Sequence, residues 1–131
     1  MPPQIIRGNA RNANASQSKG WVVGHFISKG LCSSGGLEIK IWHYDGPIEY
    51  GVKTFKGTEF FIVERGALRV ELDIPDGDGS FTSTQVVLKG NTRDYIVIPP
   101  NCKKRIVVLD APSFGVTVRW PSAPGINQLS A

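Results

Sequence analysis

Few side chains of this chain could hold a catalytic metal ion. Glu59 offers a carboxylate at the start of a strand-forming segment, but the only two histidines, His25 and His43, lie far from it in separate segments. A mononuclear iron, manganese, nickel or zinc site needs three or four nitrogen, oxygen or sulfur donors, and imidazole is the usual nitrogen donor. The sequence therefore predicts no bound metal, no cofactor and no metal-dependent redox chemistry.

Glu59 is expected to lie in the first strand of a β-hairpin. Residues 58–65 and 67–73 are rich in strand-forming side chains, and Gly66 separates the two runs. Glycine suits a tight turn because it adopts positive φ angles without a steric cost. The pattern predicts two antiparallel strands that meet at Gly66, with Glu59 on one face of the first.

A second group of candidate side chains lies on the segment 37–44. Its alternation places Glu38, Lys40, Trp42 and Tyr44 on one face, and Leu37, Ile39, Ile41 and His43 on the other. Periodicity alone does not decide which face looks inward. If the mixed face does, Trp42 and Tyr44 form the wall of a pocket with Lys40 at its mouth; otherwise they pack between sheets or subunits. Arg119, in a later strand, is a further candidate anchor for an anion.

The composition describes a single all-β domain. The chain has 131 residues, 40% of them hydrophobic, which is enough for one core of ordinary size. Its 15 glycines and 9 prolines separate short runs of β-branched and aromatic residues, and no run keeps an apolar period near 3.6. Strands are expected over 21–27, 37–44, 48–54, 58–65, 67–73, 81–88, 95–98, 103–109 and 114–120. Many short strands at near-regular spacing predict a closed or double-sheet barrel.

The remaining segments predict how the chain is organised and where it works. The small polar residues before position 20 predict a flexible arm over 1–19, followed by a barrel domain over 20–122 and a tail over 123–131. Two cysteines far apart, Cys32 and Cys102, predict reduced thiols, and no apolar run is long enough for a membrane span. The net charge is +4 without any nucleic-acid-binding motif. We therefore expect a cytoplasmic protein with no membrane or nucleic-acid partner.

The spacing of Gly46, Glu59 and Gly66 resembles the first motif of the cupins, a family of small jelly-roll barrels. That motif is a glycine, five residues, His-x-His, three or four residues, a glutamate, six residues and a glycine. The histidine positions fall on Val52 and Thr54, or on Lys53 and Phe55, depending on the gap that is counted. Neither choice supplies an imidazole.

The second cupin motif, Pro-x-Gly-x-x-His, resembles residues 99–104. Asn101 takes the place of the turn glycine, which is tolerable because asparagine accepts left-handed backbone angles better than most residues. Lys104 takes the place of the third histidine. The resemblance covers about residues 20–122 and implies the cupin double-stranded β-helix.

Within that family the chain looks like a subgroup of short single-domain cupins that have no settled biochemical role and go under the name of signal peptidase. Residues 20–27, 37–40 and 117–122 carry this likeness. A signal peptidase needs a membrane anchor and a positioned Ser–Lys pair. We expect neither here, because the apolar runs are short and most serines lie in predicted loops.

The resemblance implies that the motif positions point into the barrel, so that Glu59 and Lys104 face each other across a cavity. Two interpretations stay open. The pair is either a structural ion pair, or a catalytic site in which Lys104 binds a carboxylate or phosphate and Glu59, its pKa raised by a dry pocket, acts as general acid or base. Lys53, in a histidine position, joins Lys40, Trp42, Tyr44 and Arg119 as a candidate ligand-binding residue.

These residues predict a metal-independent cupin that binds a small organic molecule with an anionic or polar head. The alternative is a metal-free enzyme for an isomerisation, cyclisation or lyase step; a sugar-nucleotide epimerase is disfavoured because no histidine base stands in the motifs. Because both members of the pairs Phe60–Phe61 and Val107–Val108 are apolar, both faces of the sheet are expected to be buried. A homodimer is therefore expected.

Overall fold

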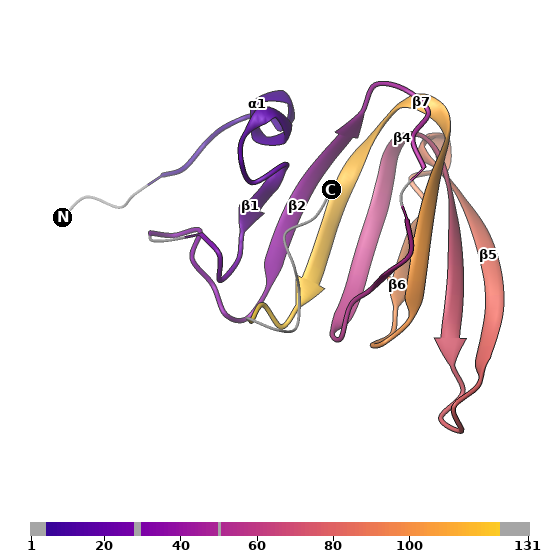
Figure 1. The fold of residues 1–131 in the computed structure, drawn as a ribbon. Helices are drawn as coiled ribbons and strands as arrows, with labels where there is room; N and C mark the ends of the chain where they lie inside the picture. The colour runs from indigo at the N-terminus through magenta and orange to yellow at the C-terminus, as the bar shows by residue number, and fades with distance from the viewer. Residues whose placement is uncertain (1–4, 28–29, 50, 124–131) are drawn as a thin grey trace.

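The computed structural model describes residues 5–27, 30–49 and 51–123, which form one seven-stranded sheet and a short helix (Figure 1). In chain order the elements are α1 (Ala10–Ala15), β1 (Trp21–Val23), β2 (Glu38–Tyr44), β3 (Lys53–Thr54), β4 (Thr58–Pro75), β5 (Phe81–Lys89), the 3₁₀ turn η1 (Gly90–Thr92), β6 (Tyr95–Ile98) and β7 (Lys103–Trp120). The all-β class that the sequence predicted is confirmed.

Two long strands, β4 and β7, organise the sheet. They run antiparallel along most of their lengths, and each half of the pair has its own flanking strands. The first half of β4 and the second half of β7 lie between β6 and β2, with β1 beyond β2. The other two halves lie between β5 and β3. The sheet is thus folded into two layers that share β4 and β7 (Figure 1).

The hairpin predicted at Gly66 is wrong, because β4 continues through this residue. The strands predicted over 58–65 and 67–73 are the two halves of one element, and those over 103–109 and 114–120 are likewise joined in β7. Gly66 has a φ of 86°, and the register between β4 and β7 shifts around it. Such irregularities bend a strand without ending it. Gly66 therefore marks the corner where β4 passes from one layer to the other.

The corner also requires glycine for lack of space. A Cβ atom on Gly66 would lie 2.0 Å from Oγ of Ser113 and 2.7 Å from the carbonyl oxygen of Asp110. Ser113 is fully buried there; its hydroxyl donates to Asp110 and accepts a hydrogen bond of 3.2 Å from the Ala67 amide. A side chain at position 66 would therefore push β4 away from β7.

The other predicted strands match to different degrees. Residues 38–44, 81–89 and 95–98 form strands within one residue of the expected bounds, whereas β1 covers only three residues of the predicted 21–27. The strand predicted over 48–54 is reduced to β3, with a single isolated bridge from Glu49 to Val107; its residue 50 lies outside the described residues. Short flanking strands suffice here because the long pair carries most of the pairing.

The N-terminal segment differs from the expected arm without secondary structure, since residues 10–15 form α1. The side chain of Asn9 accepts from the amide of Asn12 at 2.9 Å and so caps the helix. Asn14 donates to the carbonyl of Ile41 on β2 at 2.9 Å, and the Ile41 amide donates to Gly20 at 2.8 Å. Hydrogen bonds rather than apolar burial thus attach this polar segment to the sheet. Most of the predicted tail lies outside the described residues, and the domain boundaries stay a prediction.

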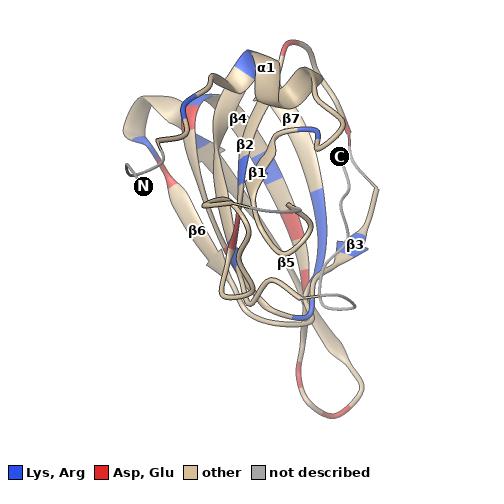
Figure 2. Cartoon of the chain, turned by 90° about the vertical axis from the view of Figure 1, so that its left-hand side faces the viewer, with Lys and Arg blue, Asp and Glu red and all other residues tan. Residues whose placement is uncertain are grey.

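The core lies between the two layers. Its buried apolar members are Trp42, Phe61, Val63, Leu68, Val70, Leu72, Leu88, Ile98, Cys102 and Val108. Cys32 and Cys102 are both free thiols, as the sequence predicted. In the described part of the chain no helix has the length and apolar character needed to cross a membrane. Figure 2 shows basic and acidic segments together on the strands in the middle of the molecule, where several charged side chains are buried.

Candidate functional site

A small cavity of about 50 Å³ opens between the two layers. Four of its lining side chains are cationic, namely Lys40, Lys53, Lys104 and Arg119, and the rest of the lining is Trp42, Tyr44, Gly51, Phe61, Leu68, Ile106 and Thr117. The structure therefore brings every predicted ligand-binding residue and Lys104 to one cavity. Glu59 does not line it but lies directly behind Lys104 and Arg119.

The structure decides the orientation of β2, which periodicity left open. Lys40 and Trp42 are buried, and together with Tyr44 they line the cavity. Trp42 lies opposite Gly115 on β7, where an added Cβ atom would come within 2.5 Å of the indole ring. The rings of Trp42 and Tyr44 stack with centroids 5.4 Å apart. The mixed face of β2 thus points inward, and Gly115 leaves room for its largest side chain.

A lysine occupies a histidine position in each of the two cupin motifs, and the two lysines lie on neighbouring strands. Lys53 on β3 pairs in register with Lys104 on β7, and both line the cavity. Val52 is 63% exposed, so the spacing that puts Lys53 in a histidine position matches the inward face. Asn101 has a φ of 67°, the left-handed angle expected for a residue in place of the turn glycine.

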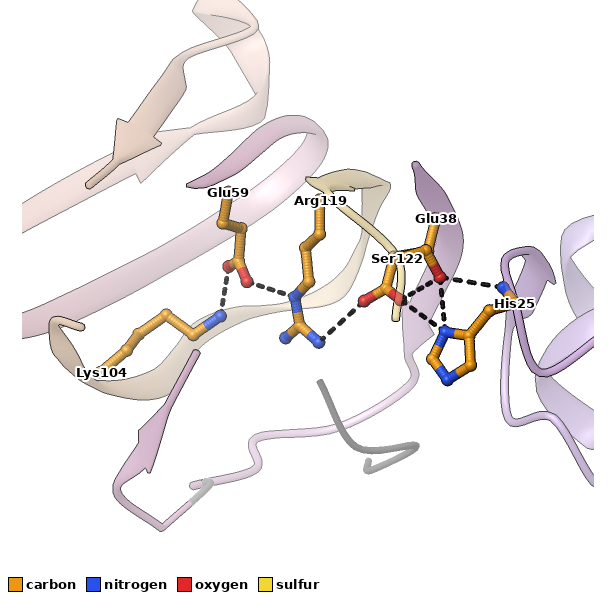
Figure 3. A network of polar contacts seen from close by, with 6 residues as sticks. All are labelled: His25, Glu38, Glu59, Lys104, Arg119 and Ser122. Atoms are coloured by element: carbon orange, nitrogen blue, oxygen red, sulfur yellow. Dashed lines mark hydrogen bonds and ion pairs between the residues drawn. The ribbon is translucent and has the colours of Figure 1, made fainter. Parts of the chain in front are cut away.

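Glu59 is the centre of a buried network of charges (Figure 3). Its side chain is 3% exposed, and its two carboxylate oxygens accept separate hydrogen bonds from Nζ of Lys104 and Nε of Arg119. Arg119 lies opposite Glu59 in the same layer, whereas Lys104 comes from the half of β7 that pairs in the other layer. The carboxylate therefore joins the two layers through an ion pair across the cavity wall.

The predicted rise in the pKa of Glu59 is wrong. Burial by itself raises this pKa, but the charges and hydrogen bonds of Lys104 and Arg119 more than reverse the effect and hold it below its usual value. The carboxylate is therefore ionised at neutral pH and serves as a poor proton donor. This arrangement favours the structural interpretation of the pair, in which Glu59 holds two cations in place.

Comparisons with known proteins show which solved structures share this fold. No protein-family model matches the sequence, and no curated protein matches it. Among solved structures, oxalate decarboxylase of Bacillus subtilis superposes with a TM-score of 0.60 at 16% identity over 72% of this chain and 24% of that chain. The cupin domain of Drosophila melanogaster CENP-C gives a TM-score of 0.51 at 16% identity, over 69% of this chain and 64% of that one. The chain has the cupin fold.

A third structure, the capsular polysaccharide assembling protein CapF of Staphylococcus aureus, shares the cupin fold with a TM-score of 0.50, 15% identity and coverage of 69% of this chain and 24% of that chain. The present chain thus spans about a quarter of the length of CapF and of the decarboxylase. At these identities the likeness concerns the fold alone. The Mn(II) centres named for the decarboxylase belong to that protein.

The donor set of the present chain does not fit such a metal. Lysines stand at two of the motif positions, and Glu59 is engaged by two cations. Within the described ranges, no three His, Cys, Asp or Glu side chains lie close enough together to hold an ion. His43 contacts Asp45 at 2.8 Å, and His25 contacts Ser122 at 2.7 Å, so each imidazole has a separate polar neighbour.

Sequence reasoning missed the part of the network that surrounds Glu38. This carboxylate is fully buried, and its Oε1 lies 3.8 Å from Nη1 of Arg119. Ser122 donates to its Oε2 at 2.9 Å and contacts Nδ1 of His25 at 2.7 Å (Figure 3). Burial raises the pKa of Glu38, and the interactions with Ser122, Arg119 and His25 oppose that rise in part. The alternation of β2 was the available signal, since it places Glu38 on the face of Lys40.

The cavity has a positive electrostatic environment. The pKa of Lys40 is lowered to about 8, first by burial and then by the nearby charges of Arg119, Lys104 and Lys53, and Glu59 opposes this shift only in part. The pKa of Lys53 is also lowered, by burial and then by Arg119. At Lys40, the repulsion from these cations outweighs the attraction of Glu59, whereas at Lys104 the charge of Glu59 is the larger effect. An additional negative charge in the cavity would relieve the repulsion.

Proposed function

We propose that this cupin binds a small organic anion, without a metal, in the cavity between its two layers. The observation that carries the proposal is the convergence of Lys40, Lys53, Lys104 and Arg119 on one cavity whose described lining contains no acidic side chain. Glu59 holds Lys104 and Arg119 in position from behind. An anion in front of these cations would complete the balance of charge that Glu59 begins.

The size of the cavity limits the ligand to a few non-hydrogen atoms. A volume of about 50 Å³ accommodates a small number of water molecules, since a buried water needs roughly 10–15 Å³ or more. Pockets for drug-sized ligands are roughly 300–1,000 Å³. A short carboxylic acid is therefore favoured over a nucleotide sugar or a lipid. This is a smaller class of ligands than the anionic or polar-headed molecules expected from the sequence.

The cationic and apolar side chains of the cavity suit the two ends of a short carboxylate. Ammonium and guanidinium groups form charge-assisted hydrogen bonds with carboxylates, and these are stronger where water is excluded. Phe61, Leu68 and Ile106 line the same cavity and offer apolar contact for a short carbon chain. The proposed ligand is accordingly a carboxylate of about two to four carbons, a size that follows from the cavity volume.

The test is an NMR titration with propionate, using uncharged propionamide of the same shape as the comparison ligand. Saturable shifts of the amides of β2 and of the Trp42 indole N–H are expected with propionate only. Lys104→Met should weaken binding by about 1.5–3 kcal/mol, roughly a 10- to 150-fold rise in Kd, because one charge-assisted hydrogen bond is lost. Lys103→Met, which removes the same charge from the exposed neighbouring position, is the matched control and should bind like the parent.

Equal binding of propionate and propionamide, or equal loss in the Lys103 and Lys104 variants, would contradict the proposal. The first result would show that charge is not recognised, and the second that only the net charge of the protein matters. Titration of chelator-treated protein tests the metal-independent part separately. Binding that disappears on chelation and returns with manganese would contradict that part alone.

The second candidate function is a metal-free enzyme that catalyses an isomerisation, cyclisation or lyase step. The observation that favours it is the amine of Lys40, whose pKa of about 8 is far below the ordinary value for lysine. Glu59 is not proposed as the acid or base of that enzyme, because its pKa is lowered. The likeness to the short cupins named signal peptidase and the cytoplasmic location stay predictions from the sequence.

We also propose that the chain forms a homodimer through the outer face of the sheet around β6. Tyr95, Val97 and Trp120 are 61%, 55% and 41% exposed, although all three are large apolar residues. Phe60 lies between Val97 and Val118 in register and contacts the ring of Tyr95. A patch without charges can pack against its own copy around a twofold axis without like-charge repulsion. This supports a second copy of the chain as the partner.

A further inference from the structure

The surroundings of the Lys40 side chain suit a reactive amine as well as a group that binds an anion. Lys40 is 8% exposed, lies on β2 opposite Thr117 and lines the cavity. Its Nζ is 5.8 Å from the centre of the buried Trp21 ring. An amine in an apolar site that also contains other cations is the setting in which lysine becomes a nucleophile.

We propose that Lys40 forms a Schiff base with the carbonyl carbon of a small 2-oxo acid bound in the cavity. The proposal rests on the anion-binding function above, because the carboxylate of the oxo acid is the anion that the other three cations would hold. A 2-oxo acid combines a carboxylate and an adjacent carbonyl within a few atoms, which matches both the charge and the size of the cavity.

The reaction needs no oxidant and no metal. The unprotonated Nζ of Lys40 donates its electron pair to the carbonyl carbon, the C=O π bond breaks toward oxygen, and a proton moves from the nitrogen to that oxygen to give a carbinolamine. The nitrogen then expels this oxygen as water, with a proton supplied by an ammonium group of the cavity, Lys53 or Lys104. The products are one iminium bond to Lys40 and one water molecule. The iminium withdraws electrons from the adjacent carbon, which is the activation that a lyase or isomerase of oxo acids requires.

Lys40 differs from the other two lysines of the cavity in ways that select it. Burial lowers the pKa of Lys104 as well, but its Nζ donates a hydrogen bond to Glu59, whose charge and hydrogen bond oppose that shift and tie up the Lys104 ammonium. Lys53 lies on the two-residue strand β3 and is only partly buried. The charge of Glu59 raises the pKa of Lys40, but the charges of Arg119, Lys104 and Lys53 together lower it by more.

The electrostatics of the cavity supply the unprotonated amine. At a pKa of about 8, roughly one Lys40 side chain in ten is neutral at pH 7, against fewer than roughly one in a thousand for an ordinary lysine. The neighbouring groups that set this value come from three elements: Arg119 and Lys104 from β7, Lys53 from β3, and Glu59 from β4. Formation of the imine should therefore increase with pH up to about 8 and then level off.

The experiment is reductive trapping of the full chain with glyoxylate and cyanoborohydride, followed by peptide mapping by mass spectrometry. We expect one carboxymethyl group per chain, located on Lys40. Glycolaldehyde, an uncharged carbonyl compound of similar size, should label this position roughly tenfold more slowly, the factor for one charge-assisted contact. Lys40→Arg keeps the positive charge but cannot form an imine, and should lose the label; Lys56→Arg at an exposed position should keep it.

Label spread over surface lysines, equal labelling by both carbonyl compounds, or full labelling of Lys40→Arg would each overturn the Schiff-base proposal. If that variant does not fold, the labelled position and the pH dependence in the unmodified protein decide the question. Calorimetry of glyoxylate without reductant separates the two proposals. Binding without labelling would refute the Schiff base and leave the anion site, whereas absence of binding would refute both.

Discussion

Replacement of Lys40 by methionine is expected to stabilise the folded protein at neutral pH, although Lys40 lies in the proposed site. Methionine keeps the length of the side chain and removes a positive charge that is buried beside Arg119, Lys104 and Lys53. The buried charge destabilises the folded protein because the cavity collects positive charges that attract an anion. The variant should therefore gain stability and lose affinity for small carboxylates.

The magnitude follows from the pKa. Folding lowers the pKa of Lys40 from 10.5 to about 8, and one pH unit corresponds to about 1.4 kcal/mol, so burial of the protonated amine costs on the order of 3 kcal/mol. Below pH 8 both the folded and unfolded states bind this proton, and the whole cost is present. Between pH 8 and 10.5 the unfolded chain binds more protons, so the stability of the parent rises with pH. The advantage of Lys40→Met should therefore be largest below pH 8 and fade toward pH 10.5.

Urea unfolding followed by circular dichroism at pH 7, 8, 9 and 10 measures this difference. Groups remote from Lys40 titrate over the same range and cancel when the variant is compared with the parent, whereas Lys53 and Lys104 lose a neighbouring charge and contribute to the same stabilisation. Lys56→Met, which removes an exposed lysine, is the control and should change stability little at any pH. A variant at position 40 that is less stable than the parent at pH 7, or whose advantage does not depend on pH, would refute the reasoning.

Three further outcomes are expected. Glu59→Gln should lower the free energy of unfolding by about 3–5 kcal/mol in urea, because Lys104 and Arg119 lose their shared carboxylate; a loss below 1 kcal/mol would contradict the network. Light scattering at micromolar concentration should give about twice the chain mass of 14.3 kDa, and Tyr95→Lys should shift the mass toward the monomer. Elemental analysis after growth in metal-supplemented medium should find no stoichiometric transition metal, and one chelator-removable ion per chain would contradict this expectation.

The class of the fold and the members of the site could be read from local features of the sequence. Strand-forming runs separated by glycine and proline predicted an all-β domain, and the resemblance of Gly46, Glu59 and Gly66 to the first cupin motif implied the cupin fold. The alternation of residues 38–44 placed Lys40 and Trp42 on one face, which the structure turns to the cavity. These features depend on neighbours along the chain, so the sequence carries them directly.

The hairpin at Gly66 shows what local pattern leaves undecided. A glycine between two apolar runs suits both a tight turn and a bend inside a strand, and only pairing with a distant partner selects between them. Here β7 pairs with both halves of β4, so the chain bends at Gly66 and continues.

The protonation state of Glu59 also depends on the pairing of strands that are distant in the sequence, so only the tertiary structure decided it. The sequence by itself determined that Glu59 is a strand carboxylate and that few imidazoles accompany it. It did not determine that Arg119, 60 positions away, would donate to that carboxylate beside Lys104. Together, Lys104 and Arg119 lower the pKa of Glu59, although burial by itself raises it. A pKa depends on charges within a few ångströms in space, and such distances are set by how the strands pair.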